Sequence, residues 1–196
     1  MADHVRRLTN AAAICALAFV TLLVIVATGR PRIDEAVAEF TAAHRTELGV
    51  DIADGISVAG SVVGIIPLGL LFAFLFWRKQ KWTPVKWMVI ASAGATTLYL
   101  VVNVIMRSAR PPMPLRVYDD VGWSFPSGHS TQAIVFWPIN AILTGRRWVL
   151  IPAVLIALTI ASSRIYLDVH WTTDVMSGLL LGLAWLFTVL AVRART

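Results

Sequence analysis

The chain has 196 residues, of which 58% are hydrophobic and 14% are charged, and its mean hydropathy is +0.74. This composition excludes an ordinary soluble domain and indicates a membrane protein. The formal net charge of +6 at pH 7 also suits a nucleic-acid-binding protein. Lys and Arg lie in short segments between apolar runs, however, as membrane topology requires, so we expect no nucleic-acid partner.

Six apolar runs follow one another with short polar connections, and each is close to the length that crosses a bilayer as a helix. They predict an all-α polytopic membrane protein, a six-helix transmembrane bundle that forms a single domain over residues 1–196. The runs cover residues 9–28, 55–77, 85–106, 129–144, 148–163 and 173–192. The first run also resembles a signal peptide, but its length and the spans that follow favour an uncleaved anchor.

The positive charges predict the orientation of the bundle. If the N-terminus is inside, more than half of the 17 Lys and Arg residues fall in inner segments. Both termini are then cytoplasmic, and the connections after the third and fifth runs face outward. Residues 33–48, between the first two runs, place Ile33, Val37 and Phe40 at helical spacing, which predicts an amphipathic helix on the outer surface with Asp34 on its wet face.

The outward connection after the third run is rich in groups that bind anions. Arg107 and Arg110 lie three residues apart and share a helical face, and guanidinium groups suit phosphate oxygens, although each alone could be an interfacial arginine beside lipid headgroups. Ser127 is a predicted N-cap of the fourth helix, so Gly128 and His129 open that helix with free N–H groups. Such a helix start is a ready anion site.

The second connection carries Arg164, His170 and Asp174. Asp174 follows His170 by four residues and can reach it if the sixth helix begins near Trp171. A carboxylate on one ring nitrogen fixes the tautomer and leaves the other nitrogen free as a nucleophile. Each residue alone has an ordinary explanation, but the set predicts phosphoryl transfer. The adjacent acids at 119 and 120 are interpreted as solvated rather than as a cation site.

These residues make the chain resemble the type 2 phosphatidic acid phosphatase superfamily, integral membrane phosphatases related to vanadium haloperoxidases. The second family motif is Pro-Ser-Gly-His, and the third is Ser-Arg, five residues, His, three residues, Asp. The matches are Pro126, Ser127, Gly128, His129, Ser163, Arg164, His170 and Asp174. In the first motif, Lys, six residues, Arg-Pro, Arg110 matches but Asn103 stands in place of the lysine. We hypothesise that Arg107 supplies the missing positive charge.

The resemblance implies an enzyme that needs no metal or other cofactor. His170 would attack phosphorus to give a phosphohistidine, and Asp174 would orient its ring. His129 would protonate the leaving oxygen and then activate water. The phosphate-binding residues would be Arg107, Arg110, Ser127, Gly128 and Arg164.

The implied substrate is a lipid phosphate or diphosphate, because a site at the outer interface leaves the headgroup wet and the tail among membrane lipids. Family members act on prenyl diphosphates such as undecaprenyl diphosphate, on phosphatidylglycerophosphate or on phosphatidate. We favour a prenyl diphosphate, since recycling of a carrier lipid at the outer face of the cell membrane suits the predicted topology. The alternative is a non-hydrolytic lipid-phosphate binding or translocating protein on the same fold. The sequence leaves the oligomeric state open.

Overall fold

The computed structural model describes residues 1–118 and 121–196, and these residues form helices and no strands. The all-α class is therefore confirmed for the described chain. The acids at 119 and 120, interpreted above as solvated, lie outside it. The elements in chain order are α1 (Ala2–Thr28), α2 (Arg32–His44), α3 (Glu47–Val58), α4 (Val62–Arg78), α5 (Trp82–Met106), α6 (Gly128–Leu143), the 3-10 helix η1 (Arg147–Val149), α7 (Leu150–Tyr166) and α8 (Thr172–Arg193).

The apolar run 55–77 does not form one continuous helix. It is divided between α3 and α4, whose axes differ by 46° across the short segment 59–61. Ser61 begins α4 as an N-cap, and its hydroxyl accepts a hydrogen bond from the N–H of Gly64 at 3.3 Å. A hydroxyl cap satisfies the free amides of a new helix, which is why the chain can change direction here within an apolar stretch.

Within the described residues, four helical segments are long and apolar enough to cross a membrane: α1, α5, η1 with α7, and α8. The bent pair α3 and α4 would make a fifth span if it crosses as one unit. α6 has 16 residues and is shorter than a full span. The predicted count of six spans is therefore not confirmed and stays a prediction.

The predicted amphipathic helix 33–48 corresponds to α2 and the first residues of α3. The prediction of a wet face is wrong for Asp34, which is only 1% exposed, whereas Ile33 and Phe40 are exposed. The reason is tertiary, because Asp34 finds Arg30 and the N-terminus of α8 as partners inside the protein. No membrane accompanies the structure, so the position of α2 on an outer surface also stays a prediction.

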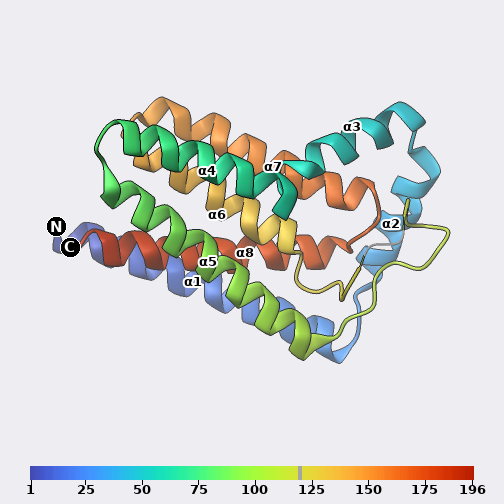
Figure 1. The fold of residues 1–196 in the computed structure, drawn as a ribbon. Coiled ribbons are helices and arrows are strands. Elements are labelled where there is room, and N and C mark those ends of the chain that lie inside the picture. The colour runs from blue at the N-terminus through green and yellow to red at the C-terminus, as the bar shows by residue number, and fades with distance from the viewer. Residues whose placement is uncertain (119–120) are drawn as a thin grey trace.

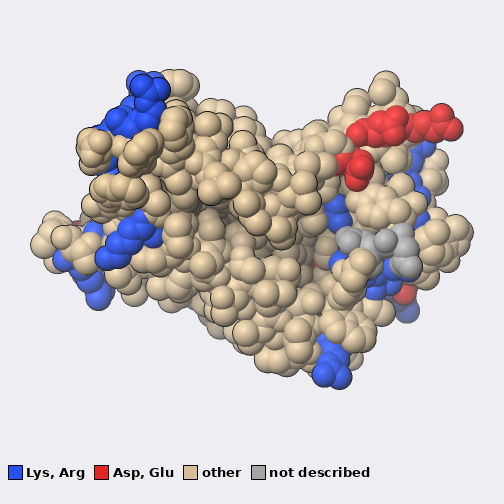
Figure 2. All heavy atoms as spheres, in the orientation of Figure 1, with Lys and Arg blue, Asp and Glu red and all other residues tan. Residues whose placement is uncertain are grey.

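The two termini lie at one end of the bundle, and the connections that carry the motif residues lie at the other (Figure 1). α6 lies at the centre and packs against α5, α7 and α8, while α1 runs along α8. Lys and Arg side chains lie at both ends of the molecule, and acidic side chains lie over α3 at the end away from the termini (Figure 2). The visible face between these ends shows no charged side chain, as a membrane-embedded band requires.

Candidate active site

His170 lies in the loop between α7 and α8, and only 4% of it is exposed. Its Nδ1 is 2.8 Å from the carbonyl oxygen of Ser124, which can only accept, so Nδ1 carries the hydrogen. The lone pair of Nε2 then faces Arg110, whose Nη1 is 3.1 Å away. Burial lowers the pKa of His170; Asp174 opposes this shift and the nearby Arg110 adds to it. The ring is therefore neutral, and its unprotonated Nε2 lies beside a guanidinium group.

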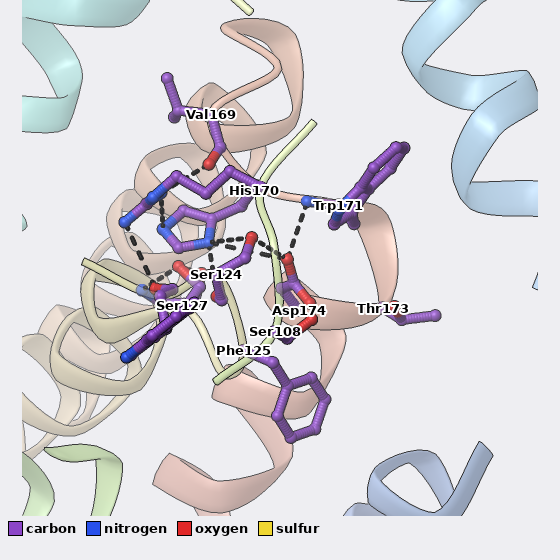
Figure 3. Close-up of polar contacts among 12 residues, drawn as sticks. Ser108, Ser124, Phe125, Ser127, Val169, His170, Trp171, Thr173 and Asp174 are labelled. Carbon is purple, nitrogen blue, oxygen red and sulfur yellow. Dashed lines mark hydrogen bonds and ion pairs between the residues drawn. The ribbon is translucent and has the colours of Figure 1, made fainter. Parts of the chain in front are cut away.

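Asp174 stands in the first turn of α8, which begins after Trp171 as predicted. The carboxylate approaches the ring as predicted, with Oδ2 3.8 Å from Nδ1 of His170, a distance within reach of an ion pair but longer than a hydrogen bond. The hydroxyl of Ser124 lies between them, donates a hydrogen bond to Oδ2 and is 3.4 Å from Nδ1 (Figure 3). Ser124, two residues before the family motif that begins at Pro126, thus contacts both the carboxylate and the imidazole.

The start of α6 is bonded to the start of α8. Ser127 is the N-cap of α6, as predicted, and its side chain accepts from the N–H of Ser130 at 3.4 Å. Its own N–H donates to the carbonyl oxygen of Asp174 at 3.0 Å. Gly128 follows with no room for a side chain, since a Cβ there would lie 2.9 Å from the ring of Tyr99. His129 stands in the same first turn, so the structure brings these motif residues together with Asp174.

The two motif arginines approach the site from different elements. Arg110, in the connection after α5, donates from Nη1 to the carbonyl of Val169 at 2.6 Å and is held next to His170 by that bond. Arg164, in α7, is 2% exposed and donates to Ser57 of α3 and to the Tyr118 hydroxyl at 3.1 Å. Burial raises the pKa of this tyrosine, while Arg164 partly opposes the shift. Tyr118 therefore stays a neutral hydroxyl beside the guanidinium group.

Arg107 is not brought into the cluster around His170. It ends α5 in the left-handed region, with φ of 46°, its side chain is exposed, and its Nε donates to the carbonyl of Val104 at 3.2 Å. Asn103, at the position of the family lysine, has a structural contact instead. Its amide donates to the carbonyl oxygens of Trp123 at 2.9 Å and Phe125 at 3.1 Å, and so fixes the segment that leads into the motif at 126–129.

The sequence did not single out Ser124, Arg30 or Asp34 as members of this site. Arg30 donates to Asp174 Oδ1 at 3.3 Å, and Asp34 accepts from the N–H of Thr173 at 2.9 Å. Arg30 and Asp34 are four residues apart, and this spacing was the one signal in the sequence that they pair. An ion pair at that spacing is commonly a surface feature, so it did not indicate a place in the site.

An apolar groove leads away from the site between α4 and α5. Its volume is about 360 Å³, and His129 lies in its wall beside Gly60 and Tyr99. A second hollow of about 320 Å³ shares Ile65 and other residues with it and continues toward the far end of α4 and α5. The two helices are joined near the termini and spread apart toward the site (Figure 1). This arrangement offers an apolar path along the bundle that ends at His129.

Comparison with known proteins agrees with this geometry. The model of the PAP2 superfamily matches residues 84–196, more than half of the chain. Phosphatidylglycerophosphatase B of Bacillus subtilis is 29% identical over 166 residues, which are 80% of this chain and 81% of that protein. Decaprenylphosphoryl-5-phosphoribose phosphatase of Mycobacterium tuberculosis is 33% identical over 126 residues, 61% of this chain and 66% of that protein.

Two solved structures share the fold. The crystal structure of a transmembrane PAP2-type phosphatidylglycerolphosphate phosphatase from Bacillus subtilis superposes with a TM-score of 0.86 at 25% identity, covering 94% of this chain and 96% of that one. The structure of LpxE from Aquifex aeolicus gives a TM-score of 0.67, also at 25% identity, and covers 80% of this chain and 94% of that one. The chain therefore belongs to the PAP2 superfamily, as a multi-pass membrane protein and a phosphoric ester hydrolase of the lipid phosphatase type.

Proposed function

We propose that the protein hydrolyses a lipid monophosphate or a prenyl diphosphate at the outer interface of the cell membrane, through a phosphohistidine on His170. The candidate substrates are an undecaprenyl diphosphate-like lipid, phosphatidylglycerophosphate and phosphatidate. The observation that carries this proposal is the apolar groove that ends at His129. A lipid tail can lie between α4 and α5 while the phosphate meets the motif residues at the end of the bundle.

The proposed first step is attack of Nε2 of His170 on phosphorus. The bond from phosphorus to the leaving oxygen breaks, and His129 gives that oxygen a proton. Arg110 stands 3.1 Å from the attacking nitrogen and is placed to hold a phosphoryl oxygen. Arg164 and the N–H of Gly128 are the further phosphate ligands in this proposal, because a helix N-terminus attracts anions. Ser127 contributes as the N-cap that begins this helix, since its own N–H is bonded to the carbonyl of Asp174.

The second step is hydrolysis of the phosphohistidine. His129, now neutral, removes a proton from water, the water oxygen attacks phosphorus, and the bond to His170 breaks to release phosphate. The hydrogen on Nδ1 stays bonded to the Ser124 carbonyl in both steps, so the ring returns to the same tautomer. The reaction needs no metal and no cofactor.

The test is phosphate release by the purified protein in detergent. The panel contains undecaprenyl diphosphate, phosphatidylglycerophosphate, phosphatidate and a water-soluble phosphate monoester. We expect one lipid to be turned over far faster than the soluble ester, and His170→Ala to abolish the reaction. Equal rates for the wild type and His170→Ala would contradict the catalytic role of His170 and would favour the alternative of a lipid-phosphate binder.

The hypothesis that Arg107 replaces the missing lysine is tested in the same assay. Its exposed side chain would have to turn from Val104 toward the phosphate when substrate binds. Arg107→Ala should then raise KM for the lipid. Full activity and an unchanged KM would exclude this role and leave Arg110 and Arg164 as the phosphate-binding arginines.

A further inference from the structure

We propose that Arg30, in the connector between α1 and α2, is a positioning residue of the reaction that holds Asp174 in place and pairs with its charge. The proposal rests on the proposed function, since Asp174 acts through His170. Nothing in the family motifs includes this residue, and the family model matches only residues 84–196. A determinant of activity would thus lie in the segment that precedes the matched region.

The contacts of Arg30 are those of an interior residue, and its side chain is 18% exposed. Nη1 lies 3.3 Å from Oδ1 of Asp174 and 3.1 Å from Oδ2 of Asp34. Nη2 donates to the hydroxyl of Ser108, and the guanidinium carbon lies 4.8 Å above the ring centre of Trp171. An exposed arginine on the surface has no such set of fixed partners.

Three of these four partners belong to the proposed mechanism or lie within two residues of it in the chain. Ser108 is two residues before Arg110, Trp171 directly follows His170, and Asp174 belongs to the site itself. One guanidinium group therefore ties together the connection after α5, the loop before α8 and the first turn of α8. The guanidinium group suits this task because it is planar and carries several N–H donors in fixed directions. The ammonium group of a lysine can bond fewer partners in fixed directions.

Arg30 also balances the negative charge of Asp174, in addition to joining these segments. Asp174 is fully buried, and its Oδ2 accepts from two neutral donors, the Ser124 hydroxyl and the N–H of Trp171 at 3.0 Å. The ring of His170 is neutral before reaction and lies 3.8 Å away. Among the described residues, Arg30 is the permanent cation that bonds this carboxylate. A buried carboxylate needs such a partner.

Asp34 keeps Arg30 in position through an ion pair at 3.1 Å and is itself bonded to the start of α8. Asp34 is 1% exposed and accepts from both the N–H and the hydroxyl of Thr173, at 2.9 and 2.6 Å. Its negative charge thus lies at the N-terminus of α8, where the free amides and the helix dipole stabilise it. Arg30 thus pairs with both Asp34 and Asp174, and Asp174 can offset the positive charge that develops on His170 during phosphoryl transfer.

The test is a double-mutant cycle with phosphate release as the readout, using the best lipid substrate. Arg30→Gln should lower kcat about 10-fold or more and leave KM within about threefold, because Arg30 contacts Asp174 and not the groove. Arg30→Lys should recover part of the loss, since it restores the charge. In the Asp174→Asn background, Arg30→Gln should cause no further loss, because the carboxylate it serves is already neutral.

The control is Arg32→Gln, an exposed arginine two residues away, which should keep wild-type kcat. If Arg30→Gln lowers kcat by the same factor in the wild-type and Asp174→Asn backgrounds, Arg30 has a merely structural role. If Arg30→Gln keeps wild-type kcat, Arg30 has no role in the reaction. If Arg30→Gln is not monodisperse on size exclusion, Arg30→Lys replaces it, and its loss of kcat is compared between the wild-type and Asp174→Asn backgrounds in the same way. An inactive wild type, or a fully active His170→Ala, would instead overturn the proposed function.

Discussion

Ser124 contacts both members of the His170 and Asp174 pair with different atoms. Its carbonyl fixes the tautomer of the ring, and its hydroxyl bonds the carboxylate. The sequence predicted a direct contact between the two partners because residues four apart at a helix start can approach each other. It could not predict that a third residue, 46 positions before His170, would fill the space between them.

Ser124→Ala should therefore lower kcat without unfolding the protein. The change keeps the carbonyl contact and removes one hydrogen bond to a buried carboxylate, which contributes roughly 1.5–3 kcal/mol, so about 10-fold or more in kcat is expected. Steady-state phosphate release measures this.

Ser177→Ala is the matched control, since Ser177 is also fully buried and its hydroxyl has no hydrogen-bond partner within the described chain. It should keep wild-type kcat. Wild-type activity in Ser124→Ala would show that the main-chain contact alone is sufficient.

The loop around His170, residues 167–171, is held on both sides of His170 by α2 and by Arg45, the residue that follows this helix. Before His170, Asp168 bonds Thr41 at 2.7 Å and Arg45 at 2.7 Å. After it, Thr173 bonds Asp34 of the same helix. Asp168 has φ of 50°, in the left-handed region that costs an L-residue about 1–2 kcal/mol, so these contacts also stabilise an unfavourable backbone conformation.

Asp168 makes the contact between the loop 167–171 and α2 sensitive to pH. Burial raises its pKa from 3.8 to about 6, although Thr41 and Arg45 oppose the shift. Between pH 3.8 and about pH 6, Asp168 therefore takes up a proton when the protein folds. The contribution of this group to the free energy of unfolding is full below pH 3.8 and is lost as the pH rises through 6.

Asp168→Asn should remove this dependence. We expect the difference in Tm between wild type and variant, measured in detergent, to change in favour of the variant as the pH rises from 4 to 6. Glu35→Gln, an exposed acid on α2, is the control and should leave the pH dependence of Tm unchanged. A constant difference between wild type and Asp168→Asn across this range would contradict the raised pKa.

At the scale of the whole molecule, the spread of α4 from α5 gives the groove its form. The break at 59–61 tilts α3 away from α4 and places Gly60 in the groove wall beside His129. A Cβ on Gly60 would lie 2.4 Å from Ile160 of α7, so the break also depends on close packing there. The groove therefore follows from the assembly of four helices.

Filling the groove should separate lipid substrates from soluble ones. Ala93→Trp places a large ring in the groove wall, so kcat/KM for the lipid should fall about 10-fold or more. Turnover of a short soluble phosphate monoester should change less than twofold, because its phosphate reaches the motif residues without a tail. Ala16→Trp, at an exposed position of α1, is the control. An equal loss for both substrates would contradict a path for the lipid tail.

The sequence by itself determined the helical membrane class, most helix bounds and the motif residues. Apolar runs, hydroxyl caps and residue spacing are local properties, and four of the six predicted runs coincide with helices at nearly the same residues, while the first, 9–28, lies within α1 (Ala2–Thr28). It also located the start of α6 at Ser127 and the start of α8 after Trp171.

Only the tertiary structure decided how the site is supported. Asp34 is buried rather than wet, Ser124 separates Asp174 from His170, and Arg30 bonds a carboxylate 144 residues further along the chain. These contacts join segments that are distant in sequence, and the charged groups are buried because each finds its partner in another element. Periodicity along one segment carries no information about such partners.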